Sequence, residues 1–146
     1  MKSLKSSILL IFVMAGMIAC QQDPGNLNSL KERMMANNYS GDYWQPSSRL
    51  EKMALNLIGV DDLLVYNDDN LNAFIFKVKD GKDPQQALDQ LEQYVKDNIT
   101  INTGSDGNKN EVSWEQIKED AKVRGQYLLL WFGENEEDLL RVFRFF

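Results

Sequence analysis

Paired carboxylates near the middle of the chain are the first residues whose types and spacing suggest chemistry. Aspartates occur in two adjacent pairs, at Asp61 and Asp62 and at Asp68 and Asp69. Such pairs can ligate hard cations or share the acid and base roles of glycoside hydrolysis. Glycoside hydrolysis also needs a cleft, and a chain of 146 residues has little length left over to build one. We therefore interpret these aspartates as helix-stop and turn residues.

A second acidic stretch alternates as a calcium-binding loop does. Asp106, Asn108 and Asn110 occupy every other position, like the first ligands of an EF-hand loop. That pattern requires Gly at its sixth position and Glu at its twelfth, where this chain has Glu111 and Ile117. We expect a solvated loop here, and a weak, irregular calcium site is the alternative.

Missing residue types restrict the chemistry further. The chain contains no histidine and a single cysteine, Cys20. Ser-His-Asp and Cys-His nucleophile pairs therefore cannot be assembled, nor can the usual zinc, copper and haem ligand sets. We expect no catalytic residue, no metal and no cofactor, and we predict that the protein is not an enzyme. An enzyme that uses only carboxylates, tyrosine or lysine is the least favoured alternative.

The single cysteine follows a segment with the features of an export signal. Lys2 and Lys5 precede an apolar run over residues 8–19, and the chain becomes polar directly after Cys20. This run is shorter than the about 20 apolar residues that span a membrane, and its pattern is typical of a secretory signal peptide. Residues 17–19, Met-Ile-Ala, resemble with Cys20 the lipobox of bacterial lipoproteins, which usually has leucine in place of Met17.

The lipobox resemblance implies cleavage before Cys20 and a diacylglyceryl thioether on its sulfur. Two or three acyl chains hold a protein on a bilayer stably, because each buried methylene contributes ~0.8 kcal/mol. We predict a signal peptide over residues 1–19, a lipidated tether over 20–28 and one folded domain over 29–146. The protein would then lie on the extracytoplasmic side of a cell membrane or envelope. An ordinary secreted protein with an incidental cysteine is the alternative.

Charge argues against one class of partner. The net charge is -6, and removal of the signal segment takes away two lysines and no acid. An acidic surface repels phosphate backbones and anionic lipid headgroups, so we expect no nucleic-acid partner.

Three aromatic residues are the candidates for a contact surface. Tyr39, Tyr43 and Trp44 occur in the polar stretch 38–47, which predicts an exposed loop. Aromatic side chains in such loops stack on sugars or anchor a partner protein. The alternative is that they cover the edge of the core.

Several elements that position these residues follow from local patterns. A short helix is predicted over residues 29–37, and strands over 63–66 and 73–79 form a hairpin. Two helices have clear starts: Ser48 with Glu51 has capping-box spacing, and Asp83 precedes a proline suited to the first helical position. The apolar residues of the first of these helices recur at helical spacing, and they are Leu50, Met53, Ala54, Leu57 and Ile58.

The C-terminal third predicts a helix, a strand and a helix. A capping box at Ser113 opens a helix that ends near Gly125, and the apolar run 127–132 predicts a strand buried on both faces. Asn135 is expected to cap the last helix, and residues 145–146 to dock on the core. Hydrophobic residues make up 43 % of the chain, which excludes disorder throughout. We predict an α+β domain with helices packed on a small, mostly antiparallel sheet of about three or four strands.

Three of these segments together resemble a known family. They are the strand running into residues 77–81 (KVKDG), the amphipathic helix after it, and residues 124–130 (RGQYLLL) followed by an acidic-start helix. Over roughly residues 50–143 the chain is similar to a family of small uncharacterised lipoproteins, mainly from Gram-positive bacteria, classed as a domain of unknown function. The polar stretch 104–110 departs from the tighter connection expected there. The family has no established activity, so the resemblance implies no site residue.

The leading hypothesis is a lipid-anchored, non-enzymatic module that binds an envelope protein or a cell-wall partner. A small-molecule or cation-binding accessory lipoprotein is the alternative, and it would rest on the acidic loops.

Overall fold

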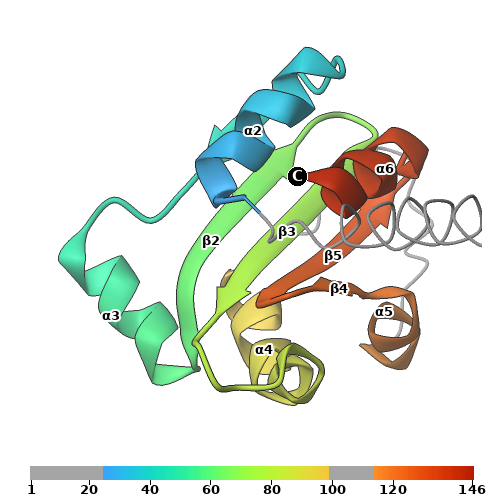
Figure 1. Ribbon diagram of the computed structural model, residues 1–146. Coiled ribbons are helices and arrows are strands. Elements are labelled where there is room, and N and C mark those ends of the chain that lie inside the picture. The colour runs from blue at the N-terminus through green and yellow to red at the C-terminus, as the bar shows by residue number, and fades with distance from the viewer. Residues whose placement is uncertain (1–24, 99–113) are drawn as a thin grey trace, which may run out of the picture.

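The computed structural model describes residues 25–98 and 114–146, and in these residues a sheet lies between two layers of helices (Figure 1). The predicted signal segment, Cys20 and the calcium-like loop at Asp106 lie outside the described residues. The predicted α+β class and the antiparallel pairing are confirmed, since every neighbouring pair of strands is antiparallel.

The predicted hairpin forms the centre of the sheet. Strand β2 (Val60–Asn67) pairs with β3 (Leu71–Val78), with Leu64 opposite Ile75. The turn between them is fixed by Asp68, whose carboxylate accepts hydrogen bonds from two backbone N–H groups, at 2.8 Å and 2.7 Å. One of the four sequence-predicted aspartates therefore does act as a turn residue.

The described sheet has five strands, so the prediction of three or four was wrong. Strand β5 (Tyr127–Gly133) pairs with β3, and two short strands, β1 (Asp42–Trp44) and β4 (Lys122–Arg124), complete the order β1-β2-β3-β5-β4. Both additional strands are three residues long and lie at the edges. A segment of that length is too short to show an alternating pattern, and its backbone is held in place by the longer strand beside it.

One face of the sheet is covered by α2 (Leu27–Ala36) and α6 (Glu137–Phe145) (Figure 1). Helix α2 begins two residues earlier than predicted, because Asn26 rather than a later residue accepts the capping hydrogen bond, from Ser29 N at 2.9 Å. Asn135 was predicted to cap α6, but it does not. It has a φ of 67°, and the helix starts after Glu136 without a side-chain cap.

The opposite face carries α3 (Arg49–Leu57), α4 (Pro84–Asn98) and α5 (Trp114–Asp120). With helices on both sides, β3 is buried on both faces. Helix α5 ends sooner than the predicted end near Gly125, because the residues that follow it form β4.

The predicted start signal of α3 is confirmed. Ser48 Oγ accepts from Glu51 N at 3.1 Å, and the Glu51 carboxylate accepts from Ser48 N at 2.9 Å. Gly59 ends the helix with a φ of 81°, in the left-handed region that glycine adopts without strain. Asp83 also caps as predicted, accepting from Gln85 N at 3.0 Å at the start of α4.

At the described C-terminal end, only one of the two predicted docking residues reaches the core. The Phe146 ring packs edge-on against Tyr127, with centroids 5.0 Å apart, and Phe145 is exposed. Arg124 on β4 holds this end by donating hydrogen bonds to the backbone oxygens of Arg144 and Phe146.

Candidate functional site

The predicted contact aromatics do not form one exposed loop. Tyr39 is buried, packs edge-on against Tyr66 with ring centroids 5.4 Å apart, and donates a hydrogen bond to Asn135 O at 3.0 Å. Tyr43 is half-buried and donates to the backbone oxygen of Tyr39 at 2.6 Å. Trp44 alone keeps a large exposed surface. For Tyr39 the structure therefore agrees with the alternative, that the aromatic residue covers the core.

These tyrosines belong to a polar cluster that includes a residue the sequence did not single out. Tyr66 on β2 donates a hydrogen bond to Asp68 at 2.5 Å, and burial is the main reason that its pKa rises to about 12. Burial acts to raise the pKa of Asp68 as well, but the hydrogen bonds from Tyr66 and from the backbone lower it below its usual value. Burial also raises the pKa of Tyr43. At neutral pH these tyrosines therefore stay protonated, and the Tyr66 hydroxyl group donates to the carboxylate that forms the turn.

The remaining aspartates do not assemble a cation site. The Asp62 carboxylate accepts from the neighbouring Leu63 N at 2.9 Å. Within the described ranges, no three groups among His, Cys, Asp and Glu side chains lie close enough together to hold a metal ion. The cation site considered from the sequence therefore lacks a set of three such ligands in this part of the chain.

The most unusual surface of the described residues is the outer face of α3. The sequence predicts an apolar stripe there, and such stripes normally face the core. Instead Leu50 is 79 % exposed, Met53 54 % and Leu57 88 %, and Ala54 is exposed beside them. Only Leu55 of this helix is buried. We call Leu50, Met53, Ala54 and Leu57 the α3 surface.

Trp44 lies on the same side of the sheet as the α3 surface. The neighbouring Tyr43 packs against the core beneath α2 and α6, and successive side chains of a strand point to opposite faces. Trp44 therefore points to the face that carries α3, whose buried Leu55 belongs to the core of that face. The sequence signal for this surface was present in the helical spacing, but the spacing does not tell which way the stripe faces.

Cationic side chains flank α3. Arg49 and Lys52 are exposed on the helix itself. At its C-terminal end, Lys79 Nζ donates to Asn56 O at 3.0 Å, and a Cβ on Gly59 would come within 2.8 Å of Lys82 Nζ. Lysines at this end complement the partial negative charge of a helix C-terminus.

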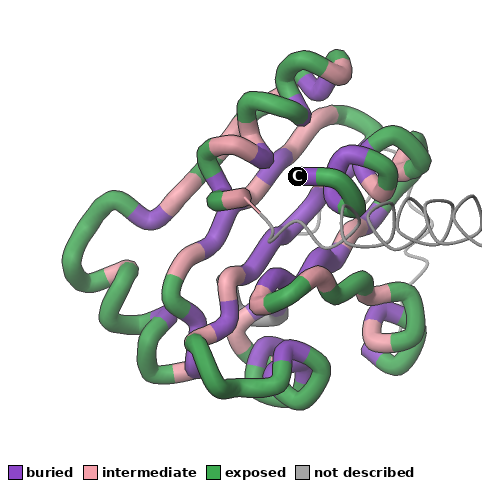
Figure 2. The backbone as a smooth tube through the Cα atoms, in the orientation of Figure 1, coloured by how far each residue is buried: buried purple, intermediate pink, exposed green. Residues whose placement is uncertain are grey.

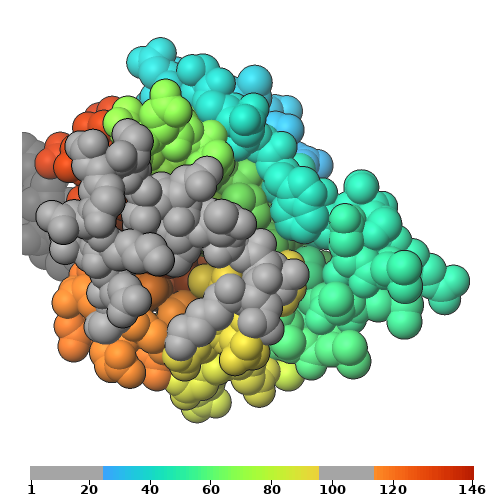
Figure 3. Space-filling model, turned by 180° about the vertical axis from the view of Figure 1, so that it is seen from behind, coloured from blue at the N-terminus to red at the C-terminus, as the bar shows by residue number. Residues whose placement is uncertain are grey.

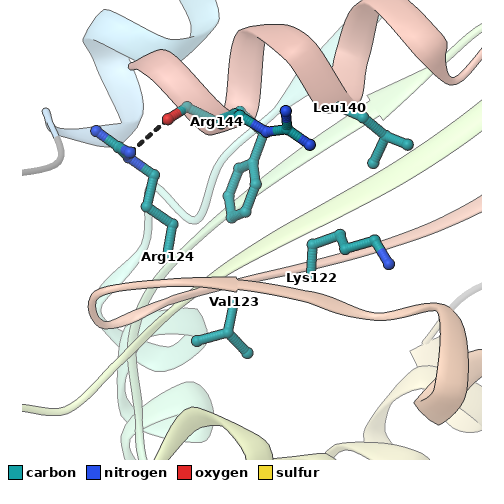
Figure 4. A pocket seen from close by; sticks show the side chains of 6 residues that line it. Lys122, Val123, Arg124, Leu140 and Arg144 are labelled. Carbon is teal, nitrogen blue, oxygen red and sulfur yellow. Dashed lines mark hydrogen bonds between the residues drawn. The ribbon is translucent and has the colours of Figure 1, made fainter. Parts of the chain in front are cut away.

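A separate, small pocket lies between β4 and α6 (Figure 4). Its volume is about 200 Å³, below the about 300–1,000 Å³ of typical ligand sites. Arg124 is engaged by the backbone of the C-terminal end, and Lys122 Nζ lies 5.9 Å from the ring centroid of Trp131. The pocket is lined by Lys122, Val123, Arg124, Leu140, Phe143 and Arg144. Its lining is thus cationic, although the chain is acidic overall.

Comparison with known proteins does not assign this chain to a family. No protein-family model matches it, and neither does a curated protein or a solved structure. In the two described ranges, no helix has both the length and the apolar composition that crossing a bilayer requires. The resemblance to a lipoprotein family of unknown function stays a prediction, and function is inferred from the residues and surfaces themselves.

Proposed function

We propose that this protein is a membrane-anchored extracytoplasmic lipoprotein whose folded domain is a non-enzymatic binding module for a component of the cell envelope. The anchor in this proposal is the lipid on Cys20. Support for the anchor comes from the lysines, apolar run and lipobox-like residues at the start of the sequence. A further point is that the only cysteine of the chain stands where this chemistry needs it.

The observation that carries the binding role is the α3 surface. A stripe of exposed leucine and methionine costs free energy in water, about 25 cal/mol for each Å² of apolar surface left uncovered. Folded domains rarely keep such side chains together on one face unless a partner covers them. Leu50 and Leu57 lie two turns apart on the same side of α3, so they present one surface rather than scattered contacts.

The non-enzymatic part of the proposal is supported by what the polar residues do. Asp68, Tyr66 and Tyr43 are engaged with one another or with backbone groups. Glu51 is engaged in the capping box of α3. These groups hold turns and helix ends in place, which is a structural role for the side chains that the sequence offers for acid and base chemistry.

The anchor is tested by intact mass spectrometry of the membrane fraction, comparing the wild type with Cys20→Ala. We expect a mature chain that begins at Cys20 and carries acyl mass, and we expect the variant to lack that mass. A wild-type chain cut elsewhere and released unlipidated into the medium would contradict the anchor and leave a freely secreted domain.

A second candidate function is a small-molecule-binding accessory lipoprotein. The pocket between β4 and α6 favours it, and its cationic lining favours a small anion over the cation suggested by the acidic loops. Isothermal titration with inorganic phosphate tests this, with Arg144→Gln as the pocket variant. Arg141→Gln is the matched control, because Arg141 is exposed on the same helix and outside the pocket lining. Heat that Arg144→Gln alone abolishes supports the candidate, and the absence of heat in the wild type removes it.

A further inference from the structure

We propose that the α3 surface docks on the anionic lipid surface of the membrane that holds the anchor on Cys20. This inference rests on the proposed function, and it names the envelope component that the α3 surface binds. The protein would then contact the bilayer at two places, through the lipid on Cys20 and through α3.

The shape of the region suits a flat partner. Helix α3 projects from a corner of the molecule (Figures 1 and 3), and the tube in Figure 2 is exposed along most of its length. Its apolar residues recur at positions i, i+3, i+4 and i+7, so they form one outward stripe. A projecting helix can lay its apolar stripe on a flat partner, whereas a small ligand binds in a concave pocket. Shallow burial of such a stripe in the headgroup layer is how interfacial helices bind membranes.

Although the chain as a whole is acidic, the charges on α3 itself favour anionic lipid. Arg49 and Lys52 lie on α3, and no salt bridge joins either of them to an acid of the described residues. The acid of the helix, Glu51, is turned toward the N-terminal cap, where it accepts from Ser47 N and Ser48 N.

The turn at the other end of the helix adds Lys79 and Lys82, with Asp80 between them. The neighbouring Asp61, Asp80 and Asp83 offset these two lysines, so the apolar stripe supplies the contact, and Arg49 and Lys52 on α3 orient it. Basic residues around an apolar face are typical of helices that lie on anionic membranes.

The size of the surface argues against a stable protein complex through α3 alone. A helix of nine residues is about 14 Å long. Its outward stripe therefore offers far less than the about 800 Å² that each partner of a standard protein interface contributes. A second copy of this chain, pairing helix to helix, faces the same shortfall.

A bilayer that carries the anchor needs no such interface area, because the anchor already holds the domain close to the lipid surface. Cys20 lies six residues before the Asn26 cap of α2, a distance of at most about 22 Å for an extended chain. Helices α2 and α3 contact the same strand, β2, from opposite faces of the sheet, so the start of the domain and α3 both lie beside that strand. A tether this short makes the second contact intramolecular and raises its effective concentration.

Two methionines provide a matched pair of probes for this contact. Met53 on α3 is 54 % exposed and Met35 on α2 is 55 % exposed, and both lie in helices. Met53→Cys and Met35→Cys are prepared in the full-length lipidated chain, in which thioether formation leaves Cys20 without a thiol. Each is labelled with a nitroxide and reconstituted in phosphatidylglycerol vesicles. Leu57→Cys is a second α3 probe in case the first label disturbs the helix.

Collision of the nitroxide with oxygen and with a soluble nickel chelate measures membrane contact. We expect the label at position 53 to collide much less often with the nickel chelate and more often with oxygen. The label at position 35 should remain as accessible to the nickel chelate as it is on the protein in solution without vesicles. Equal accessibility at both positions overturns the docking. Protection at Met53 in native membranes but not in the lipid vesicles also overturns it, and identifies an envelope protein as the occupant.

Failure of the anchor and failure of the docking give different results. Acyl mass on Cys20 without protection at Met53 contradicts the docking and leaves the lipoprotein proposal standing. A chain without acyl mass that still protects Met53 when mixed with the vesicles contradicts the anchor, and the α3 contact then stands by itself.

Discussion

Helices α3 and α6 have the same length and similar amphipathic sequences, yet the structure uses them in opposite ways. Each has nine residues with apolar side chains at helical spacing. In α6, Leu139, Val142 and Phe143 are buried against the sheet, whereas in α3 only Leu55 is buried. Local pattern thus specifies that a helix forms, and the neighbouring elements decide whether its apolar face is covered. The apolar face of α3 is therefore available to a partner, whereas the apolar face of α6 is already buried in the core.

The largest effect expected from this difference is in the core beneath α6. Leu139→Ala removes a fully buried side chain that packs on both α2 and the sheet, so we expect the free energy of unfolding to fall by roughly 2–5 kcal/mol. Urea denaturation followed by circular dichroism measures it. A loss below about 1 kcal/mol would show that α6 is as loosely attached as α3, and the contrast between the helices would disappear.

The tyrosine cluster on the α6 side predicts a pH dependence that α3 does not share. Burial raises the pKa of Tyr66 to about 12, above the value near 10 that it has in an unfolded chain. A group whose pKa is raised on folding stabilises the protein fully below its unfolded pKa, and this contribution is lost as the pH rises through the folded pKa. We therefore expect the melting temperature to fall as the pH increases from 10 to 12.

Tyr66→Phe is the control for that decline. The variant is expected to be less stable at neutral pH, because Asp68 loses the hydrogen bond that lowers its pKa. Between pH 10 and 12 its melting temperature should change less than that of the wild type. A decline of the same size in both proteins would mean that other groups titrate there.

How far the sequence predicted these regions depends on how local the signals are. The β2–β3 hairpin and the starts of α3 and α4 were predicted because turn and cap residues act within a few positions, as Asp68, Ser48 and Asp83 do. Strands β1 and β4 were missed because pairing with a distant neighbour creates them. Asn135 was mistaken for a cap because its left-handed backbone cannot be read from its type.

The candidate surface was predicted even less completely. Tyr39 was expected to be exposed, but α2 and α6 cover the ring, and that covering depends on tertiary packing. The stripe of α3 was identified as apolar, while its outward orientation follows from where β2 begins and how Leu55 attaches the helix. Sequence patterns thus named most of the side chains involved and left the direction of the stripe open.

A smaller effect is expected at the start of α3. Ser48→Ala removes half of the capping box and should destabilise the helix by about 1 kcal/mol. Because α3 is attached mainly through one buried side chain, we expect faster hydrogen exchange in α3 and little change in the global melting temperature. An equal increase of exchange throughout the sheet would indicate that α3 unfolds only together with the core.

The smallest effect on stability is expected on the exposed face of α3 itself. Leu57 is 88 % exposed, so Leu57→Ser removes almost no buried area and should change the free energy of unfolding by less than about 0.5 kcal/mol. The same substitution removes part of the proposed membrane contact, so it should reduce the protection of a label at Met53 in phosphatidylglycerol vesicles. Met35→Ser, at a similarly exposed methionine on α2, should change neither quantity. If Leu57→Ser instead destabilises the fold as Leu139→Ala does, then α3 packs against the domain in solution and its stripe serves stability. Unchanged stability together with lost protection would show that the apolar face of α3 serves binding and not stability. The sequence pattern alone does not distinguish α3 from α6 in this respect.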